Sequence, residues 1–156
     1  TNKELIIRFY SAFQAMNYAE MQQCYHPEAV FSDPAFGTLN AAEVKAMWQM
    51  LLTRSKDLQI TFSDVDATQT SGKCRWEAWY TFSKTGRPVH NVINSSFEFR
   101  DGKIYRQNDS FEMWRWSRQA LGIPGLLLGW SPLIRRKVEK SARQSLGKFM
   151  SQPSMA

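Results

Sequence analysis

The stretch YHPEAVFSDPAFG, residues 25–37, decides the fold, because a helical segment ends there and a strand-like run stops at Asp33-Pro34. Val30 and Phe31 favour a strand, whereas Pro34 cannot donate to a strand ladder and pushes the residue before it to extended geometry. Asp33 is therefore a lone carboxylate held among apolar side chains. Such surroundings raise the pKa of a carboxyl, as a general base near neutral pH requires. The alternative is that Asp33 only starts a turn, since Asp-Pro favours turns.

The residues on either side of this stretch predict helices first and strands later. Apolar residues at spacings of three and four predict helices over 2–15, 18–25 and 40–54. Beyond Asp57 the period changes to two, which predicts strands around 58–62 and over 73–83, 89–100 and 103–116. This order indicates an α+β domain: a cone-shaped α+β barrel with three N-terminal helices packed on a strongly curved antiparallel sheet, and a pocket between them.

The C-terminal residues differ in charge from the rest of the chain. Residues 1–116 carry 13 Lys/Arg and 13 Asp/Glu, whereas residues 117–156 carry seven basic residues against Glu139 alone. A neutral body argues against nucleic-acid binding, which needs basic residues over the binding face. We therefore divide the chain into a cone domain, 1–116, and a basic C-terminal helical extension of the same domain, 117–156.

The extension contains an apolar loop, residues 122–130, and a predicted helix over 132–150. The apolar stripe of this helix is Ile134, Val138, Ala142, Leu146 and Phe149, with basic residues elsewhere. One interpretation is a helix that packs on the body or on a second subunit with its basic face in water. The other is an element that lies on a membrane surface.

Composition indicates one domain with a ligand pocket. The chain has 156 residues, 43% of them hydrophobic, and its six Trp, five Tyr and ten Phe suit a cavity for a small apolar ligand. Cys24 and Cys74 form no disulfide framework and are expected to be inert thiols; no Cys/His cluster has metal-ligand spacing, so we expect neither metal nor cofactor. No leader or apolar run of 18 residues is visible, so a cytoplasmic location is the default expectation. A processed or otherwise exported chain is the alternative.

The order of elements resembles the nuclear-transport-factor-2-like superfamily. The resemblance rests on Phe9-Tyr10, Tyr25, VFSDP at 30–34, Gly37 and FEFRDGKI at 97–104. Residues 2–116 are most similar to SnoaL-like proteins, which include small polyketide cyclases and have relatives in ketosteroid isomerase and limonene epoxide hydrolase. The resemblance implies the cone fold and a homodimer, while the scaffold hosts enzymes, binding proteins and assembly domains.

Compared with ketosteroid isomerase, Asp33-Pro34 falls where that family carries its general base. Phe9 stands at the position of the oxyanion-hole tyrosine, with Tyr10 one place off, and Ser95 stands at the position of the protonated aspartic acid. These departures argue against steroid isomerisation.

Compared with limonene epoxide hydrolase, Asp109 falls where a water-activating aspartate sits. Arg75-Trp76-Glu77 could match the arginine–acid pair of that family if Arg75 and Glu77 face inward. A shift of one residue turns every side chain to the other face, and we favour the register in which Trp76, Ala78 and Tyr80 line the cavity. His90 then points away from it.

The predicted site contains two catalytic carboxyls and a set of ligand-binding side chains. The carboxyls are Asp33 and Asp109; the ligand-binding residues are Phe9, Phe13, Trp48, Trp76, Tyr80, Asn91, Ser95, Gln107 and Phe111. If the two carboxyls lie close together, repulsion keeps one protonated and gives an acid/base pair. The alternative is that Asp109 only accepts hydrogen bonds from buried Trp or Tyr. Trp114-Arg115-Trp116, at the sheet's end, either closes the pocket mouth or makes a dimer contact.

Two functions follow from these observations. The first is cofactor-independent isomerase, cyclase or epoxide-hydrolase-type chemistry on a small apolar molecule, with Asp33, Asp109 or both moving a proton. The second is a non-catalytic ligand-binding or dimeric assembly module, whose basic tail docks to a partner or a membrane surface.

Overall fold

The computed structural model describes residues 1–129 and 131–152. Its elements are, in chain order, α1 (Asn2–Gln14), α2 (Tyr18–Gln23), β1 (Tyr25–Asp33), β2 (Gly37–Asn40), α3 (Ala41–Arg54), β3 (Gln59–Ala67), β4 (Ser71–Phe82), β5 (Arg87–Arg100), β6 (Lys103–Ser110), α4 (Met113–Leu121), α5 (Ile123–Leu128) and α6 (Pro132–Ser151). The three N-terminal helices, β4 and β5 are where the sequence predicts them, whereas β3 is longer than predicted and β6 is shorter. Trp130 and residues 153–156 of the predicted extension lie outside the described residues.

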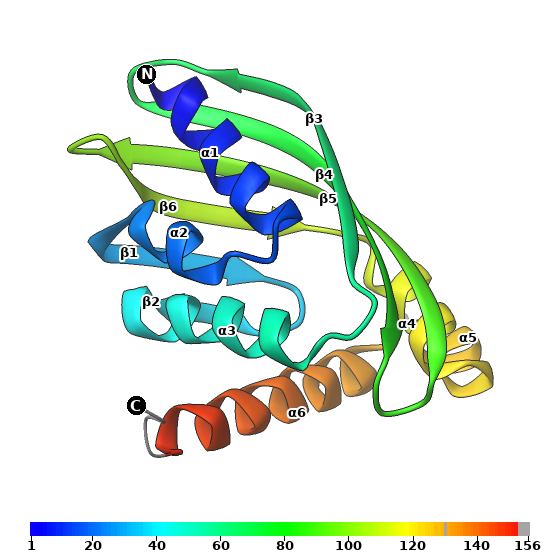
Figure 1. Ribbon diagram of the computed structural model, residues 1–156. Helices are drawn as coiled ribbons and strands as arrows, with labels where there is room; N and C mark the ends of the chain where they lie inside the picture. Colours follow the sequence, from blue (N-terminus) through cyan, green and yellow to red (C-terminus); the bar gives the residue numbers. More distant parts are fainter. Residues whose placement is uncertain (130, 153–156) are drawn as a thin grey trace.

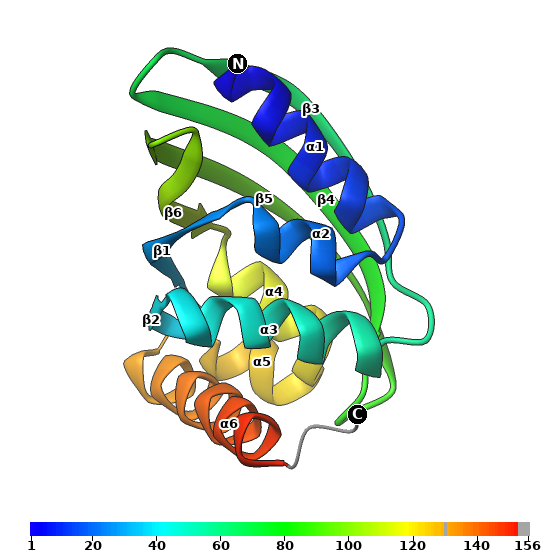
Figure 2. The same cartoon turned by 60° about the vertical axis from the view of Figure 1, so that its left-hand side comes forward.

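One curved sheet carries the fold, with strand order β2-β1-β6-β5-β4-β3. Neighbouring strands are antiparallel except β1 and β6, which run parallel. Figures 1 and 2 show α1, α2 and α3 together on one side of this sheet. The predicted α+β cone is confirmed, with one parallel pair where only antiparallel pairs were expected.

The stretch around Asp33 forms a longer strand than the sequence indicates. β1 begins at Tyr25 and ends at Asp33, and the chain turns back at once into β2. Gly37 opens β2 with a φ of +70°, a conformation that an L-residue adopts only under strain. The turn between β1 and β2 therefore fixes where the Asp33 side chain is held.

Helices α1 and α3 are positioned by capping boxes and apolar faces. Thr1 and Glu4 cap α1, and Asn40 and Glu43 cap α3, each pair satisfying backbone N–H groups of the first turn. The buried face of α1 is Leu5, Ile6, Phe9, Tyr10, Ala12 and Phe13, and that of α3 is Val44, Met47, Trp48, Met50 and Leu52. Both helices thus direct aromatic side chains toward the inner face of the sheet.

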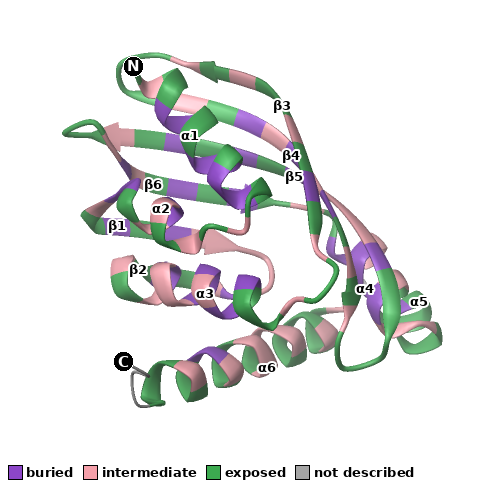
Figure 3. Ribbon diagram, viewed as in Figure 1, coloured by how far each residue is buried: buried purple, intermediate pink, exposed green. Residues whose placement is uncertain are grey.

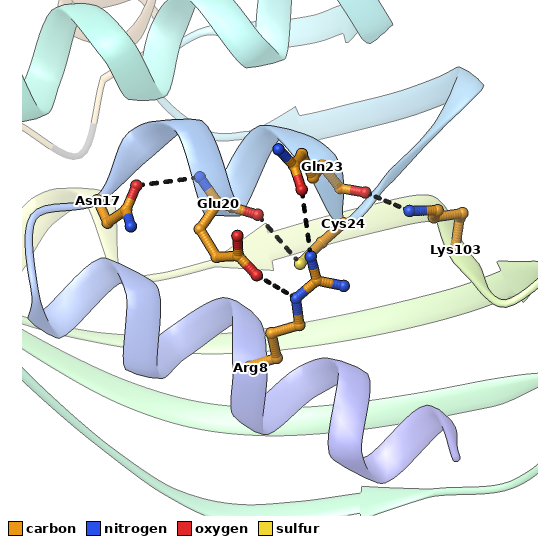
Figure 4. Close-up of polar contacts among 6 residues, drawn as sticks. All are labelled: Arg8, Asn17, Glu20, Gln23, Cys24 and Lys103. Carbon is orange, nitrogen blue, oxygen red and sulfur yellow. Dashed lines mark hydrogen bonds and ion pairs between the residues drawn. The ribbon is translucent and has the colours of Figure 1, made fainter.

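Polar contacts hold α2 against α1 and the sheet (Figure 4). Arg8 of α1 pairs with Glu20 of α2, and Lys103 Nζ donates to the Gln23 carbonyl oxygen at 2.6 Å. Cys24 is fully buried beneath them, and its Sγ donates to the Glu20 carbonyl oxygen at 3.4 Å. Burial raises the pKa of the Cys24 thiol to about 11, which agrees with an inert thiol.

The prediction of a strand over 103–116 is wrong beyond Ser110. β6 ends there, and Trp114, Arg115 and Trp116 lie in α4. The reason is visible in the spacing of the residues that α4 buries, Met113, Trp116, Ser117 and Ala120, which is i, i+3, i+4, i+7. The predicted boundary at residues 116 and 117 falls inside this helix.

The segment expected to be an apolar loop, 122–130, contains the short helix α5, and α6 follows as predicted. Figure 2 shows α6 alongside α3. Leu146 of α6 is 2% exposed, and Ala142 and Phe149 pack partly buried against the same core. The extension therefore packs on the body through its apolar stripe. None of the helices in the described residues is long and apolar enough to cross a membrane.

Candidate functional site

The register of β4 decides which side chains face the interior. Cys74, Trp76 and Ala78 are buried, whereas Arg75 and Glu77 lie on the opposite face. The register that places Trp76 and Ala78 inside is therefore confirmed. The match to the arginine–acid pair of limonene epoxide hydrolase is lost, since Arg75 and Glu77 face away from the interior.

His90 lies on this outer face, as expected. Its Nε2 is 3.0 Å from Glu77 Oε1, and its ring stacks on Trp79 with centroids 4.7 Å apart. It takes no part in the interior site.

Asp33 is held at the end of β1 by the turn that follows it. Its Oδ1 accepts the backbone N–H groups of Ala35 at 2.9 Å and Phe36 at 2.6 Å. This is the turn expected for Asp-Pro, so the turn interpretation holds for one carboxylate oxygen. The carboxyl is also poorly hydrated: burial raises the pKa of Asp33 to about 6, against the opposing effect of the two N–H groups, and nearby Glu139 adds to the rise.

Asp109 lies near the end of β6 and is 6% exposed. Its Oδ1 accepts the Ser95 hydroxyl at 2.6 Å and the Gln107 amide at 3.2 Å. Burial raises the pKa of Asp109 to about 7, and the negative charge of Asp33 contributes to the rise, while the two hydrogen bonds oppose it. The two carboxyls thus interact, and both titrate above the ordinary range of an aspartate.

Two chains of hydrogen bonds converge on Asp109 from the surrounding aromatic residues. Tyr10 Oη and Trp76 Nε1 donate to Ser95 Oγ at 2.8 and 2.9 Å. On the other side, Trp48 Nε1 donates to Tyr25 Oη at 2.8 Å, and Tyr25 donates to Gln107 Oε1. Buried Trp and Tyr groups therefore reach Asp109 through Ser95 and Gln107. Ser95 and Gln107 donate to Oδ1 directly, and the aromatic groups donate to these chains further out. This arrangement fixes the orientation of the carboxyl.

The predicted aromatic wall is continuous around these groups. The Phe9, Phe13, Trp48 and Trp76 rings contact one another, with centroid separations of 5.0 Å for Phe13–Trp48 and 5.1 Å for Phe13–Trp76. Such edge-on and tilted contacts are the preferred geometries of aromatic pairs. The interior around the carboxyls is thus apolar apart from the hydrogen-bonded chains.

The other predicted ligand-binding residues lie nearer to the surface. Tyr80 is half-buried and its Oη accepts Trp116 Nε1 at 2.7 Å. Asn91 and Phe111 border a hollow of about 430 Å³, which is also lined by Val92, Asn94, Ser110, Glu112 and Arg115. The structure therefore brings Phe9, Phe13, Trp48, Trp76, Ser95 and Gln107 together around Asp109, and places Asn91 and Phe111 at this hollow.

Tyr10 and Tyr25 are the two residues of this network that the sequence prediction left out. Tyr10 is fully buried, and Tyr25 is 3% exposed. Tyr10 follows Ile6 by four residues on the apolar face of α1, so helical spacing could have placed it inside. Nothing in the sequence around Tyr25 indicates that its hydroxyl meets Gln107.

The extension lies against the turn that follows Asp33. Arg143 of α6 donates through Nη1 to the carbonyl oxygens of Phe36 at 2.8 Å and Thr38 at 3.0 Å. A methyl group on Gly37 would lie 2.5 Å from Glu139 Oε1, so α6 packs directly against this turn. Within the described residues, no group of three or more His, Cys, Asp or Glu side chains could hold a metal ion.

The fold is the cone of the nuclear-transport-factor-2-like proteins, which solved structures of that description share. The chain belongs to the SnoaL-like family, because the profile of the SnoaL-like domain matches residues 6–107. A search of curated proteins finds no significant match.

Solved structures share the fold at low sequence identity. A hypothetical protein with a ketosteroid isomerase-like fold from Catenulispora acidiphila is 13% identical, with a TM-score of 0.67 over 83% of this chain and 98% of that one. IdmH, a candidate polyketide cyclase from Streptomyces antibioticus, is 21% identical, with a TM-score of 0.65 over 79% and 99%. An LEH-like epoxide hydrolase of M. tuberculosis is 14% identical, with a TM-score of 0.64 over 81% and 95%. At these identities the likeness shows the fold alone.

Proposed function

We propose that the protein is a cofactor-independent enzyme that transfers protons to and from a small apolar molecule carrying a carbonyl or an epoxide. The observation that carries this proposal is the Asp109 carboxyl, buried, oriented through Oδ1 by Ser95 and Gln107, and coupled to Asp33. A carboxyl fixed through one oxygen can exchange a proton through the other. General acid and base catalysis needs groups that titrate near the working pH, as these two do.

Asp33 acts as the base and Asp109 as the acid in this proposal. Two backbone N–H groups stabilise the ionised form of Asp33, whose pKa is about 6. Asp109 is held by neutral side chains, repelled by the charge on Asp33, and keeps its proton to a higher pH, about 7. The ionised base and the protonated acid thus coexist between these values. We expect a bell-shaped dependence of kcat/KM on pH with its maximum between about 6 and 7.

The two carboxyls exchange protons in the same way with either substrate class: Asp33 accepts one and Asp109 gives one. With a carbonyl compound, Asp33 removes a proton from the adjacent carbon and Asp109 gives its proton to the oxygen, which forms an enol. With an epoxide, Asp33 removes a proton from an attacking water while Asp109 protonates the ring oxygen, which forms a diol. The apolar interior of Phe9, Phe13, Trp48 and Trp76 favours a substrate without charge.

The names of two structural neighbours support these reaction classes without deciding between them. One is described as a candidate polyketide cyclase and one as an epoxide hydrolase. A single positioned base contributes roughly 10²–10⁴-fold. Phe9 and Ser95 replace the oxyanion donors of ketosteroid isomerase, and the Tyr10 hydroxyl is engaged with Ser95. We therefore expect a slow turnover unless Gln107 or Asn91 donates to the substrate oxygen.

The test combines a carboxyl titration with a turnover screen. Carbon-13 NMR of the side-chain carboxyls follows Asp33 and Asp109, assigned with Asp33→Asn and Asp109→Asn. Apolar ketones are screened for deuterium uptake from D₂O and apolar epoxides for diol formation, using wild type, both variants and Asp66→Asn, a control at an exposed carboxyl. We expect both carboxyls to titrate above pH 5, and both site variants to lose at least 100-fold in rate.

A second candidate function is favoured by the packing of the interior. Phe9, Phe13, Trp48 and Trp76 contact one another directly, as the core of a non-catalytic binding or assembly module would. If both carboxyls titrate near the ordinary value of about 4 and the screen gives no turnover, the module is the correct interpretation.

A further inference from the structure

The helix α5 exposes its apolar side chains to solvent. Exposed fractions are 72% for Ile123, 49% for Leu126 and 46% for Leu128, and Leu133 at the start of α6 is 58% exposed. Figure 3 shows α5 mostly in the colour of exposed residues, whereas the strands of the sheet alternate between buried and exposed residues. Clustered exposed leucines of this kind mark an interaction surface rather than the scattered apolar residues of an ordinary protein surface.

Packing of α5 on α4 explains why the leucines face outward. A methyl group on Gly125 would lie 1.9 Å from the Ser117 carbonyl oxygen, and one on Gly129 would lie 2.7 Å from Ser117 Cβ. Ser117 is itself fully buried. The two helices thus approach so closely that only glycine fits at the contact. The glycine face of α5 is buried, and its larger apolar side chains have to point away from the body.

Basic residues share a face of α6 with the exposed Leu133. On α6, Leu133 shares one face with Arg136, Lys137 and Lys140, at the spacing i, i+3, i+4, i+7. All four side chains are exposed. Residues 117–156 carry seven Lys/Arg against one acidic residue, and that residue, Glu139, lies against Gly37. Leu133 therefore lies on a face of α6 that carries uncompensated positive charge, directly after the exposed apolar side chains of α5 in the chain.

We propose that the surface formed by Ile123, Leu126, Leu128 and Leu133 with Arg136, Lys137 and Lys140 docks onto an anionic lipid bilayer. Leucines enter the boundary between head groups and acyl chains, and the basic side chains contact lipid phosphates. Charge decides against a second copy of the chain as the occupant, because pairing this surface with itself would bring two strongly basic patches together. The protein lies on the membrane in this proposal and does not span it.

Vesicle sedimentation of the full chain tests the proposal. The probes are vesicles of phosphatidylcholine alone and vesicles with 30% phosphatidylserine, each at 0.1 M and 0.5 M salt. We expect the protein to sediment with the phosphatidylserine vesicles at 0.1 M salt, and to be released at 0.5 M salt because the charge attraction is screened. Little sedimentation is expected with phosphatidylcholine alone.

Two variants and two matched controls separate the charged and apolar contributions. Arg136→Gln/Lys140→Gln should weaken binding about 30-fold, since each basic residue near the surface contributes about fivefold. Lys3→Gln/Lys73→Gln removes the same charge from two exposed lysines of the body and should leave binding unchanged. Ile123→Ser/Leu133→Ser should weaken binding at least about 10-fold. Ile7→Ser/Val30→Ser, at side chains 40% and 37% exposed, is its control.

The proposal fails on any of three results. The first is that wild type sediments with neither vesicle. The second is that the control variants lose as much binding as the docking variants. The third is that Leu133→Ser converts a dimer to a monomer in sedimentation equilibrium while vesicle binding is absent, which would identify a second copy as the occupant. Thermal unfolding followed by circular dichroism distinguishes lost docking from lost folding: each variant should melt at the same temperature as wild type.

Discussion

Replacement of Asp109 by asparagine is expected to stabilise the fold at alkaline pH. In the native state Asp109 has a pKa of about 7, whereas its ordinary value is 3.8. Between these values the native state keeps a proton that the unfolded chain has released, so the free energy of unfolding falls as pH rises. At 1.36 kcal/mol per pH unit, the whole interval amounts to roughly 4 kcal/mol. Between pH 5 and pH 8 the fall is about 3 kcal/mol.

The asparagine variant lacks this loss, because an amide does not titrate. Its oxygen can still accept from Ser95 and Gln107, so the two hydrogen bonds at Oδ1 are retained. Burial of the new amide N–H groups lowers the stability of the variant equally at both pH values, so we expect its stability relative to wild type to rise by about 3 kcal/mol from pH 5 to pH 8. Urea unfolding followed by tryptophan fluorescence at the two pH values measures it, with Asp66→Asn as the exposed control.

The opposite result would refute the reasoning. If Asp109→Asn destabilises the protein more at pH 8 than at pH 5, the native carboxyl is ionised at neutral pH and its charge is stabilised by its neighbours. Asp109 would then be a structural acceptor for Ser95 and Gln107, and the proposed acid would have no proton to give.

Three further outcomes are expected. Ser95→Ala leaves the buried Tyr10 hydroxyl and Trp76 indole N–H without an acceptor and should lower the free energy of unfolding by roughly 2–4 kcal/mol in urea, with exposed Ser96→Ala unchanged. Glu139→Gln removes a negative charge near Asp33 and should lower the pKa of Asp33 below about 6 in a carbon-13 NMR titration, with Glu98→Gln as control. If the expected homodimer forms through the outer face of the sheet, Trp79→Arg should raise its Kd at least 10-fold by analytical ultracentrifugation, while Ile7→Arg should not.

Most of the fold could be predicted because hydrophobic periodicity is strong where one face of each element is buried. The inward register of Trp76 and Ala78 followed from preferring apolar rings inside, and burial confirms it. The wrong prediction of a strand at Trp114-Arg115-Trp116 also came from hydrophobic periodicity. Alternation over three residues suggested a strand, whereas the residues that are buried from Met113 to Ala120 follow helical spacing. The parallel pairing of β1 with β6 joins segments far apart in sequence, and no local pattern specifies it.

The candidate site could be predicted only at its centre. Asp33 was recognisable as a carboxyl in apolar surroundings, and Asp109 through the resemblance to limonene epoxide hydrolase; both pKa values are raised. The hydrogen-bond chains through Ser95 and Gln107 depend on the relative positions of α1, α3 and the sheet, since Tyr10 and Ser95 are 85 residues apart. Period-two reasoning placed Ser95 and Gln107 on the inner face but gave no information about their partners.

The C-terminal extension is the part of this chain that the SnoaL-like family match leaves unexplained, because the match ends at residue 107. Two contacts tie the residues beyond 107 to the site. Trp116 donates to Tyr80, and Arg143 holds the turn that follows Asp33. The extension also carries the leucines and basic residues of the proposed docking surface. A bilayer that binds α5 and α6 would therefore act directly on α6, which borders Asp33, and through α5 on α4, which borders Tyr80. Since an apolar substrate partitions into the same bilayer, we expect docking and access to the carboxyls to be coupled, and phosphatidylserine vesicles to change KM more than kcat.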